Sequence, residues 1–399
     1  MSEVFEGSFT QQDPIPREGI EAAIRVMESG RLHRYNVAEG EFSEAALLEQ
    51  EFAELTGARY CVAVASGGSA MATALRAIGV RPGDKVLSNA FTLAPVPGAI
   101  ASLGAVPVIV EVTEDLTIDL TDLETRIAAS GARVLLLSHM RGHLCDMAAL
   151  MTLCDRAGVT VIEDCAHTMG ASWDGTASGR HGAMAAYSTQ TYKHVNSGEG
   201  GFLTSDDEVL MARAILLSGS YMLFDRHLSK PAADVFEQVK YDTPNVSGRM
   251  DNLRAAILRP QLKTLQDQCD GWTERYREVE SGLRDLAGLK VIERPEQERF
   301  VGSSIQFLLP GWRADQIRNL VARCLKRGVE LKWFGAEEPA AFTSRYDSWH
   351  YANPEPMPKT DAVLAQLMDM RVPLTFSLQD CAQISRIIRS EVSALWQQG

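Results

Sequence analysis

Short apolar segments alternate with helix-forming segments between residues 60 and 163, and this alternation constrains the fold more than any other feature. Five runs have the length and apolar character of buried strands: 60–65, 85–88, 106–110, 133–138 and 159–163. The intervening segments 69–78, 96–103, 123–129 and 147–157 have helical periodicity. Because strands joined by helices form βαβ units, we predict an α/β domain with a mainly parallel sheet covered on both faces.

Helical patterns also flank this region and dominate the last third of the chain. They occur at 17–29, 44–56 and 208–217, and a long pattern runs from 250 to 286 with Pro260 interrupting it. Strands at 304–309 and 330–333 then precede a closing helix at 381–396. We therefore predict a large domain over residues 1–260, including the N-terminal segment, and a smaller α+β C-terminal domain over residues 261–399.

Composition excludes several classes of protein. The chain has 39 Lys and Arg against 52 Asp and Glu, a formal net charge of −13, and this disfavours binding to a nucleic-acid backbone. No apolar run approaches the roughly 20 residues that span a bilayer, so no membrane partner is expected. Seven cysteines without regular spacing argue against a disulfide framework. The polar N-terminus does not resemble a signal peptide, and a cytoplasmic protein is expected.

A glycine-rich turn follows the first strand of the predicted sheet. Ser66, Gly67, Gly68 and Ser69 stand immediately before a helical segment. Glycines let the backbone approach an anion closely, and the N–H groups and dipole of a helix start favour a phosphate. The alternative is an ordinary strand-to-helix turn that uses glycine for its backbone freedom. The motif alone leaves both interpretations open.

Asp164 ends the strand predicted at 159–163. A carboxylate in this position needs a cation or several hydrogen bonds. One suitable cation is a protonated pyridine nitrogen, which acts as an electron sink while an acid holds it protonated. The alternatives are a cap on the next helix or an ion pair with an arginine.

Lys193 lies 29 positions later, in a polar segment followed by Gly198, Gly200 and Gly201. If it is buried, desolvation lowers its pKa and makes a neutral amine that can form a Schiff base. If it is solvated, it is an ordinary loop lysine. A phosphate cradle, a pyridine-nitrogen acid and a Schiff-base lysine in this order together indicate a site for pyridoxal 5′-phosphate (PLP).

With these residues in place, the chain resembles the DegT/StrS family of PLP-dependent aminotransferases, which have the fold type I of aspartate aminotransferase. The resemblance runs from about Ile15 to the C-terminus. The matching segments are Ala65–Ala70, Arg81–Val86, Glu163–His167, Ser188 with Lys193, Gly198–Gly201 and Arg249–Asp251 with Ala255, Ala256, Gln261 and Leu262.

The resemblance implies the catalytic roles. Lys193 would form the Schiff base with the cofactor and move the proton between cofactor and substrate carbon. Asp164 would pair with the pyridinium nitrogen, and His167 would lie near the phenolic oxygen of the cofactor.

It also implies binding roles and a partner. Ser188 and the turn of Gly67, Gly68 and Ser69 would hold the phosphate. Arg249 would reach the active site of a neighbouring subunit, which implies a homodimer with shared sites.

Four positions depart from the family pattern. Leu93 stands where an aromatic residue usually stacks on the cofactor ring, and Ser247 stands where the family usually has Asn. The segment ending at Tyr221 replaces an Asn-His-Gly-like turn. Arg141 stands where the family has an apolar or aromatic residue, and its guanidinium could donate paired hydrogen bonds to a substrate carboxylate. The other interpretation of Arg141 is a surface pair with Asp146.

A metal site is the less favoured interpretation of His139, His143 and Cys145. The two histidines are four residues apart, but their segment follows a strand and precedes a helix. Helical spacing of the two rings is therefore not expected, and we predict no metal.

The function predicted from these features is aminotransfer. Glutamate or glutamine would donate the amino group to a keto acceptor, most simply a keto-sugar or keto-cyclitol in a biosynthetic pathway. Arg34, Arg141 and the segment 332–334 could instead admit a smaller acidic molecule. Another PLP reaction, such as elimination or racemisation, and a catalytically silent PLP-fold protein stay open as alternatives. Nucleotide-binding and nucleophile-elbow motifs are absent from the sequence.

Overall fold

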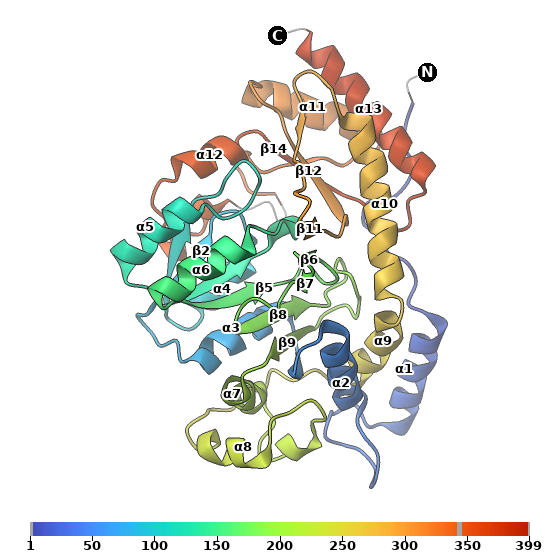
Figure 1. Cartoon of the computed structure of the whole chain (residues 1–399). Coiled ribbons are helices and arrows are strands. Elements are labelled where there is room, and N and C mark those ends of the chain that lie inside the picture. Colours follow the sequence, from blue (N-terminus) through green and yellow to red (C-terminus); the bar gives the residue numbers. More distant parts are fainter. Residues whose placement is uncertain (1–2, 341–344, 398–399) are drawn as a thin grey trace.

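A computed structural model describes residues 3–340 and 345–397 and contains a central seven-stranded sheet (Figure 1). The strand order is β1 (Tyr60–Val64), β9 (Gly201–Ser205), β8 (Met184–Ser188), β5 (Thr160–Asp164), β4 (Val134–Ser138), β2 (Lys85–Asn89) and β3 (Val106–Val110). β8, β5, β4, β2 and β3 pair in parallel, and β9 runs antiparallel to both of its neighbours. The predicted α/β fold with a mainly parallel sheet is confirmed.

Helices bury both faces of this sheet. One apolar core joins it to α3 (Gly67–Ile78), α4 (Pro95–Ala101), α7 (Glu208–Ser218) and α8 (Ala233–Val239). The other joins it to α2 (Glu44–Thr56), α5 (Leu120–Ser130), α6 (Met147–Ala157), α9 (Asn252–Leu262) and α10 (Leu265–Leu283). Leu135 and Leu136, adjacent in β4, belong to opposite cores, as the two-residue period of a strand requires. The continuous apolar runs of the sequence follow from this double burial.

A second, antiparallel sheet lies above the first in Figure 1. Its order is β10 (Lys290–Val291), β12 (Ser304–Leu308), β14 (Leu367–Arg371) and β13 (Lys332–Trp333). One face packs on α10, α11 (Ala314–Lys326) and α13 (Leu378–Trp396) through a third core. The remaining elements are α1 (Arg17–Ser29), α12 (Pro358–Leu364) and a small sheet of β11 (Glu298–Arg299), β6 (Ser172–Trp173) and β7 (Thr176–Ala177).

The two central strands of the second sheet alternate between apolar and polar residues. Ile305, Phe307, Met368 and Met370 are buried in the third core. The polar residues alternate with these apolar ones and therefore share the other face of the sheet. There Ser304 pairs with Arg371, and Gln306 pairs with Asp369. β13 places Lys332 opposite Asp369 on that same face. This polar face is turned toward the first sheet, because Asp369 and Gln306 contact the loop that follows β4.

The helical pattern over 250–286 corresponds to two helices, and the break between them lies after Pro260 rather than at it. α9 continues through Pro260 to Leu262, and α10 begins at Leu265. Proline costs the helix one hydrogen bond, but its backbone angle is compatible with helix, so α9 extends two residues beyond it. We propose residues 1–260 and 261–399 as the two structural units, with Phe5 and Phe9 packing edge-on against Phe376 of the second unit.

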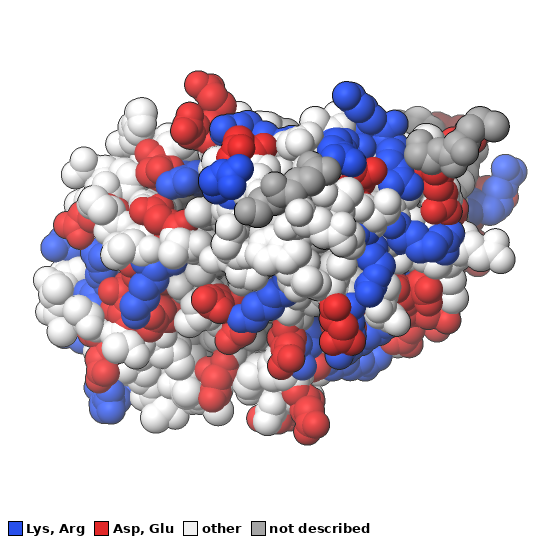
Figure 2. Space-filling view, turned by 90° about the horizontal axis from the view of Figure 1, so that it is seen from above, with Lys and Arg blue, Asp and Glu red and all other residues white. Residues whose placement is uncertain are grey.

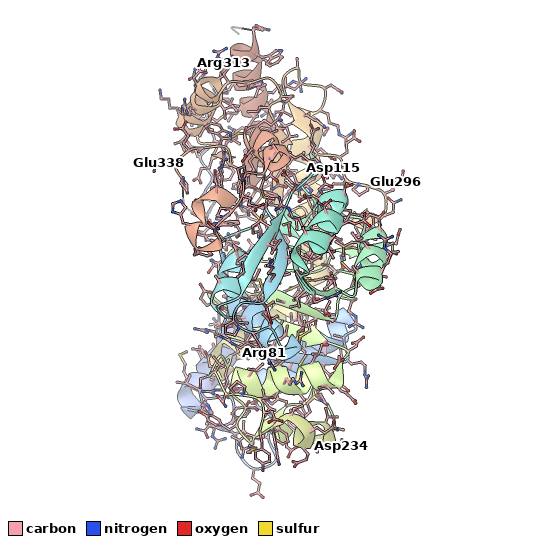
Figure 3. The ribbon with its side chains drawn as sticks, turned by 90° about the vertical axis from the view of Figure 1, so that its left-hand side faces the viewer. Arg81, Asp115, Asp234, Glu296, Arg313 and Glu338 are labelled. Atoms are coloured by element: carbon pink, nitrogen blue, oxygen red, sulfur yellow. The ribbon has the colours of Figure 1, made fainter. Side chains whose placement is uncertain are left out.

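The molecule is elongated along the direction that joins the two units. In Figure 3, Arg313 near the start of α11 and Asp234 in α8 lie toward opposite ends. Figure 2 shows the end of the molecule that carries the second sheet, where acidic and basic side chains are intermixed. No helix among the described residues is both long and apolar enough to cross a membrane.

A buried charged network ties the N-terminal segment to β1. Glu49 in α2 accepts two hydrogen bonds from the Arg34 guanidinium, at 2.7 and 2.8 Å, and a third from the N–H of Ala63 at 2.8 Å. His227 donates to Glu49 at 2.9 Å and accepts from the Tyr35 hydroxyl at 2.8 Å. Burial raises the pKa of Glu49, but Arg34 and His227 outweigh this and lower it to about 2. The network therefore holds a permanent ion pair behind β1.

We predict that Glu49→Gln destabilises the fold by about 3–5 kcal/mol, because Arg34 is left as a buried charge without its carboxylate. Urea unfolding at pH 7 measures this. Glu124→Gln, which removes an exposed pair with Arg156, is the control and should leave the urea midpoint nearly unchanged. The stabilisation from Glu49 is present above pH 4.5, its ordinary pKa, and disappears as the pH falls toward about 2. A variant as stable as the parent would contradict the prediction.

Candidate active site

A cavity of about 600 Å³ opens at the carboxyl ends of β4, β5 and β8, where ligands of parallel sheets bind. It lies between the large sheet and the polar face of the second sheet, since Arg371 of β14 also lines it. Eight of the residues predicted from the sequence line this cavity: Gly67, Gly68, Leu93, Arg141, Asp164, His167, Ser188 and Lys193. The fold thus brings together residues that are up to 126 positions apart (193 − 67).

The glycine turn forms the N-terminus of α3 at one side of the cavity. Ser66 caps the helix by accepting the Ser69 N–H at 3.0 Å, and its hydroxyl donates to the Ser69 hydroxyl at 3.1 Å. A Cβ at Gly67 would lie 2.9 Å from the Cβ of Ser188, so only glycine fits against the end of β8. The helix start and the Ser188 hydroxyl therefore form one cradle for an anion.

Asp164 lies at the bottom of the cavity with 6% of its surface exposed. Its carboxylate accepts hydrogen bonds from the Ser138 hydroxyl at 3.0 Å and from the Ala166 N–H at 3.1 Å. Burial raises the pKa of Asp164, and the nearby Lys193 charge opposes this rise. The partners of Asp164 are a hydroxyl and a local backbone N–H rather than an arginine, which leaves it able to pair with a cation in the cavity.

Lys193 is half-buried and its Nζ lies 2.9 Å from Nε2 of His167. Desolvation, together with the charges of Arg141 and Arg371, lowers the pKa of Lys193 to about 7, although the charge of Asp164 opposes this shift. Burial and the Lys193 charge hold the pKa of His167 well below its usual value. His167 is therefore neutral and accepts from Lys193, and near pH 7 a large fraction of Lys193 is an uncharged amine.

Three other predicted residues form a separate cluster outside the cavity lining. The Arg249 guanidinium donates to Gly219 O at 2.8 Å and Ser247 Oγ at 3.3 Å, and it lies 5.5 Å from the Tyr221 ring centre. Tyr221 and Ser247 have positive φ angles of 53° and 55°, which are strained for residues with a side chain. Arg249 is bridged to Val64 at the end of β1, so this cluster lies beside the α3 cradle. Ser69 is likewise not among the residues that line the cavity, and it is hydrogen-bonded to Ser66.

The structure excludes two alternatives that the sequence left open for arginines. Arg141 is not a surface residue paired with Asp146, because it is buried and bonded to Asp369 at 2.7 Å. Asp146 instead caps α6 by accepting the Ala149 N–H. Arg34, predicted as a residue that could admit an acidic substrate, is 1% exposed and bonded to Glu49, so it is closed to ligands.

In the segment 332–334, Phe334 is also closed to ligands, because it is buried in an apolar core. Lys332, by contrast, lies on the polar face of the second sheet.

The histidines of the 139–145 segment face different partners. His139 is bonded to Glu163 at 3.0 Å, and His143 donates to Gln306 at 2.8 Å. His139, Glu163 and Cys165 do lie close enough to share an ion. However, the Glu163 carboxylate already accepts the N–H groups of residues 179, 181 and 182. This carboxylate is a structural anchor whose lone pairs are in use.

Several cavity residues were not predicted from the sequence. Arg371, Tyr192, Gln190 and Met140 line the cavity, and the Arg371 guanidinium lies 3.7 Å from the Tyr192 ring centre. The alternation of apolar and charged residues in 367–371 is a strand signal that could have identified Arg371. Tyr192 precedes Lys193 in a loop, where no periodic pattern marks it.

The residues present fit pyridoxal phosphate. The glycine cradle at α3 suits its phosphate, the buried Asp164 carboxylate suits a pyridinium nitrogen, and the Lys193 amine suits its aldehyde. Together with the sheet order and the second domain, these features define an enzyme of PLP fold type I.

Comparison with known proteins leads to the family. Residues 15–389 match the model of the DegT/DnrJ/EryC1/StrS aminotransferase family. The chain therefore belongs to this family of PLP-dependent aminotransferases, as the sequence motifs indicated.

Relatives and solved structures agree with this assignment. A protein of Streptoalloteichus tenebrarius, provisionally named an L-glutamine:3-amino-2,3-dideoxy-scyllo-inosose aminotransferase, is 33% identical over 361 residues, 87% of this chain and 84% of that protein. A dTDP-3-amino-3,4,6-trideoxy-alpha-D-glucose transaminase of Micromonospora megalomicea is 34% identical over 62% of this chain and 63% of its own. The crystal structure of S. venezuelae DesV with a ketimine intermediate is similar with a TM-score of 0.79 and 27% identity, over 94% of each chain.

We predict that the Lys193 amine titrates near pH 7 rather than near its ordinary pKa of 10.5. Because the amine must be uncharged to react, the rate of Schiff-base formation between the apoenzyme and pyridoxal should rise with pH and level off above about 7. Absorbance spectroscopy measures this rate. A rate still rising steeply above pH 9 would contradict the prediction.

We also predict that Gly67→Ala weakens binding of PLP tenfold or more, because the new Cβ meets Ser188 and shifts one wall of the cradle. Fluorescence titration of the apoenzyme with PLP measures the affinity. Gly271→Ala in α10, whose Cβ would make contacts of 3.4 Å, is the control and should bind PLP normally. Equal affinity in both variants would argue against a phosphate at α3.

Proposed function

We propose that this aminotransferase uses glutamate or glutamine as the amino donor and a keto-sugar or keto-cyclitol as the acceptor, in a biosynthetic pathway. The observation that carries the catalytic part is the Lys193 amine, which has a pKa of about 7 and contacts His167 in the cavity that holds Asp164. The acceptor class is supported by the names of the related aminotransferases, which act on an inosose and on a dTDP-sugar.

In this proposal each residue has a defined task. Bound PLP supplies an electron sink that stabilises negative charge on the substrate carbon. Asp164 keeps the ring nitrogen protonated, and Ser138 orients its carboxylate. Lys193 carries the proton to and from the reacting carbon, and neutral His167 accepts a hydrogen bond from its amine.

The remaining cavity residues hold the cofactor in this proposal. Ser188 and the α3 N-terminus bind the phosphate, with Gly67 and Gly68 allowing close approach. Leu93 provides an apolar cover for the ring in place of a stacked aromatic side chain.

We further propose that the chain works as a homodimer in the cytoplasm. The cluster of Ser247, Arg249 and Tyr221 lies outside its own cavity lining and would complete the site of the neighbouring subunit. Exposed apolar side chains close to this cluster in sequence support an interface there: Tyr221 is 56%, Met222 55% and Val246 50% exposed. All seven cysteines are buried free thiols, which suits a reducing compartment.

We predict that Lys193→Ala abolishes both half-reactions and the PLP absorbance band of the Schiff base, because Lys193 is the one lysine among the described residues that line the cavity. The exposed Lys263, paired with Glu18, provides the control Lys263→Ala, which should retain full activity. Donor alone, added to the parent enzyme, should convert bound PLP stoichiometrically to pyridoxamine phosphate, followed by absorbance and mass spectrometry. Turnover without pyridoxamine phosphate would point to elimination or racemisation, and undiminished transfer by Lys193→Ala would refute the proposal.

A further inference from the structure

Two hydroxyl groups form a hydrogen-bonded chain that ends at Asp164. The Thr92 hydroxyl donates to the Ser138 hydroxyl at 2.7 Å, and the Ser138 hydroxyl donates to Asp164 Oδ2 at 3.0 Å. All three side chains are buried. Ser138 and Asp164 line the cavity, whereas Thr92 is not among its lining residues. The position of Thr92 therefore suits an effect on a ligand through Ser138 rather than by contact.

The register of the central strands places these groups side by side. Ser138 and Asp164 are the last residues of β4 and β5, and they are partners in the parallel pairing of these strands. Paired residues of neighbouring strands point to the same face of a sheet, so the hydroxyl meets the carboxylate. Thr92 comes from the segment after β2, the neighbour of β4 on its other side. Three adjacent strands thus contribute one link each.

The buried side chain of Asn89 fixes the middle link of this chain. The backbone pairing of β2 with β4 ends at Leu87, two residues before Asn89. Beyond that point Asn89 Oδ1 accepts the Ser138 N–H at 2.9 Å, and Nδ2 donates to Ser138 O at 3.1 Å. Nδ2 also donates to Phe91 O at 2.9 Å, in the segment that carries Thr92. One amide therefore holds both the backbone of Ser138 and the turn that brings Thr92 to it.

The hydrogen bonds of the chain run in one direction, toward the carboxylate. Ser138 donates its single hydroxyl proton to Asp164 and accepts the Thr92 proton with a lone pair. A hydroxyl that accepts a hydrogen bond is a stronger donor, so Thr92 strengthens the bond between Ser138 and Asp164. It also fixes the rotation of the Ser138 hydroxyl, which would otherwise be free to turn away from the carboxylate.

Stabilisation of the carboxylate decides where a proton shared with Asp164 lies. Burial raises the pKa of Asp164, which favours a proton on its own oxygen. The groups that oppose this rise are the Lys193 charge, the Ala166 N–H, the Ser138 hydroxyl and His139. A pyridine nitrogen paired with Asp164 would therefore keep its proton more firmly when the Ser138 bond is strong.

We propose that Thr92 is a positioning residue that acts through Ser138 to keep a proton on the ring nitrogen of the cofactor. The inference rests on the proposed function, because it requires Asp164 to pair with that nitrogen, and it adds a residue that sets the strength of the pairing. Thr92 directly precedes Leu93, the apolar cover of the ring in the same proposal. One short segment would thus support the ring from its face and, through Ser138, at its nitrogen.

The binding test compares PLP with 1-deaza-PLP, in which a C–H group replaces the ring nitrogen. In fluorescence titrations of the apoenzyme, Thr92→Val should weaken PLP binding about 3- to 10-fold, the range expected for one hydrogen bond. It should weaken binding of 1-deaza-PLP less than about twofold, because the analogue has no nitrogen to pair with Asp164. Thr92→Ser restores the hydroxyl and should bind PLP like the parent. If Thr92→Val does not fold, Thr92→Ala provides the same comparison with a smaller side chain.

Thr360→Val is the matched control. Thr360 is also buried and its hydroxyl donates to the Glu111 carboxylate at 2.6 Å, but it does not line the cavity. Both valine variants should lower the urea midpoint, and only Thr92→Val should discriminate between PLP and its analogue. Ser138→Ala should discriminate at least as strongly. Adding Thr92→Val to Ser138→Ala should change the discrimination no further, because the two hydroxyls act in one chain.

Nuclear magnetic resonance of the holoenzyme gives a readout that does not depend on affinity or turnover. With ¹⁵N in the ring of PLP, the chemical shift distinguishes a protonated from an unprotonated nitrogen. The parent and Thr360→Val should show a protonated nitrogen. Thr92→Val and Ser138→Ala should move the signal toward the unprotonated value, and Thr92→Ser should return it.

The outcomes separate this inference from the proposed function. Equal losses of affinity for PLP and 1-deaza-PLP in Thr92→Val, or a ring-nitrogen signal that stays at the parent value, would overturn the inference and leave aminotransfer intact. A parent enzyme whose ring nitrogen is unprotonated would instead refute the pairing with Asp164 on which the proposed function depends.

Discussion

The site depends on the free-energy cost of keeping the amine of Lys193 protonated. The amine is desolvated and faces two guanidinium groups, and a single buried carboxylate, Asp164, opposes them. The balance brings the pKa of Lys193 to about 7, where charged and neutral forms are both populated. A lysine that must react as a nucleophile and then carry protons needs both forms. The nearby charges therefore set the protonation state of this amine.

The sheet supplies this balance because parallel strands deliver their last residues to one edge. Ser138 ends β4, Asp164 ends β5 and Ser188 ends β8, and all three line the cavity. The close contact between Gly67 and Ser188 fixes the distance between the helix start and the β8 end. Both sides of the sheet are filled by apolar cores, so these strand ends have little freedom to move.

Much of this arrangement could be predicted from the sequence, and the physical reasons for success and failure differ by residue. Asp164 and the glycine turn were identifiable because they directly follow apolar runs of strand length. The parallel sheet followed from the same alternation. The alternation in 367–371 marks a strand, but placing Arg371 at the cavity requires the pairing of β12, β13 and β14, which are far apart in the chain. The ion pair of Arg141 with Asp369 was missed for the same reason, since it joins the two structural units.

The Arg141–Asp369 pair joins the wall of the cavity to the contact between the two units. Asp369 also accepts from Gln306 at 2.7 Å, and Gln306 in turn accepts from His143, so the loop that carries Arg141 is bonded to the second sheet at two neighbouring positions. A buried ion pair contributes little net stability, because desolvation of both charges offsets their attraction. Its value here is geometric: it fixes the orientation of a guanidinium whose backbone is strained. The same carboxylate that orients Arg141 also offsets positive charge at the edge of the cavity, and replacing it with a neutral residue would increase repulsion on Lys193 and lower its pKa further.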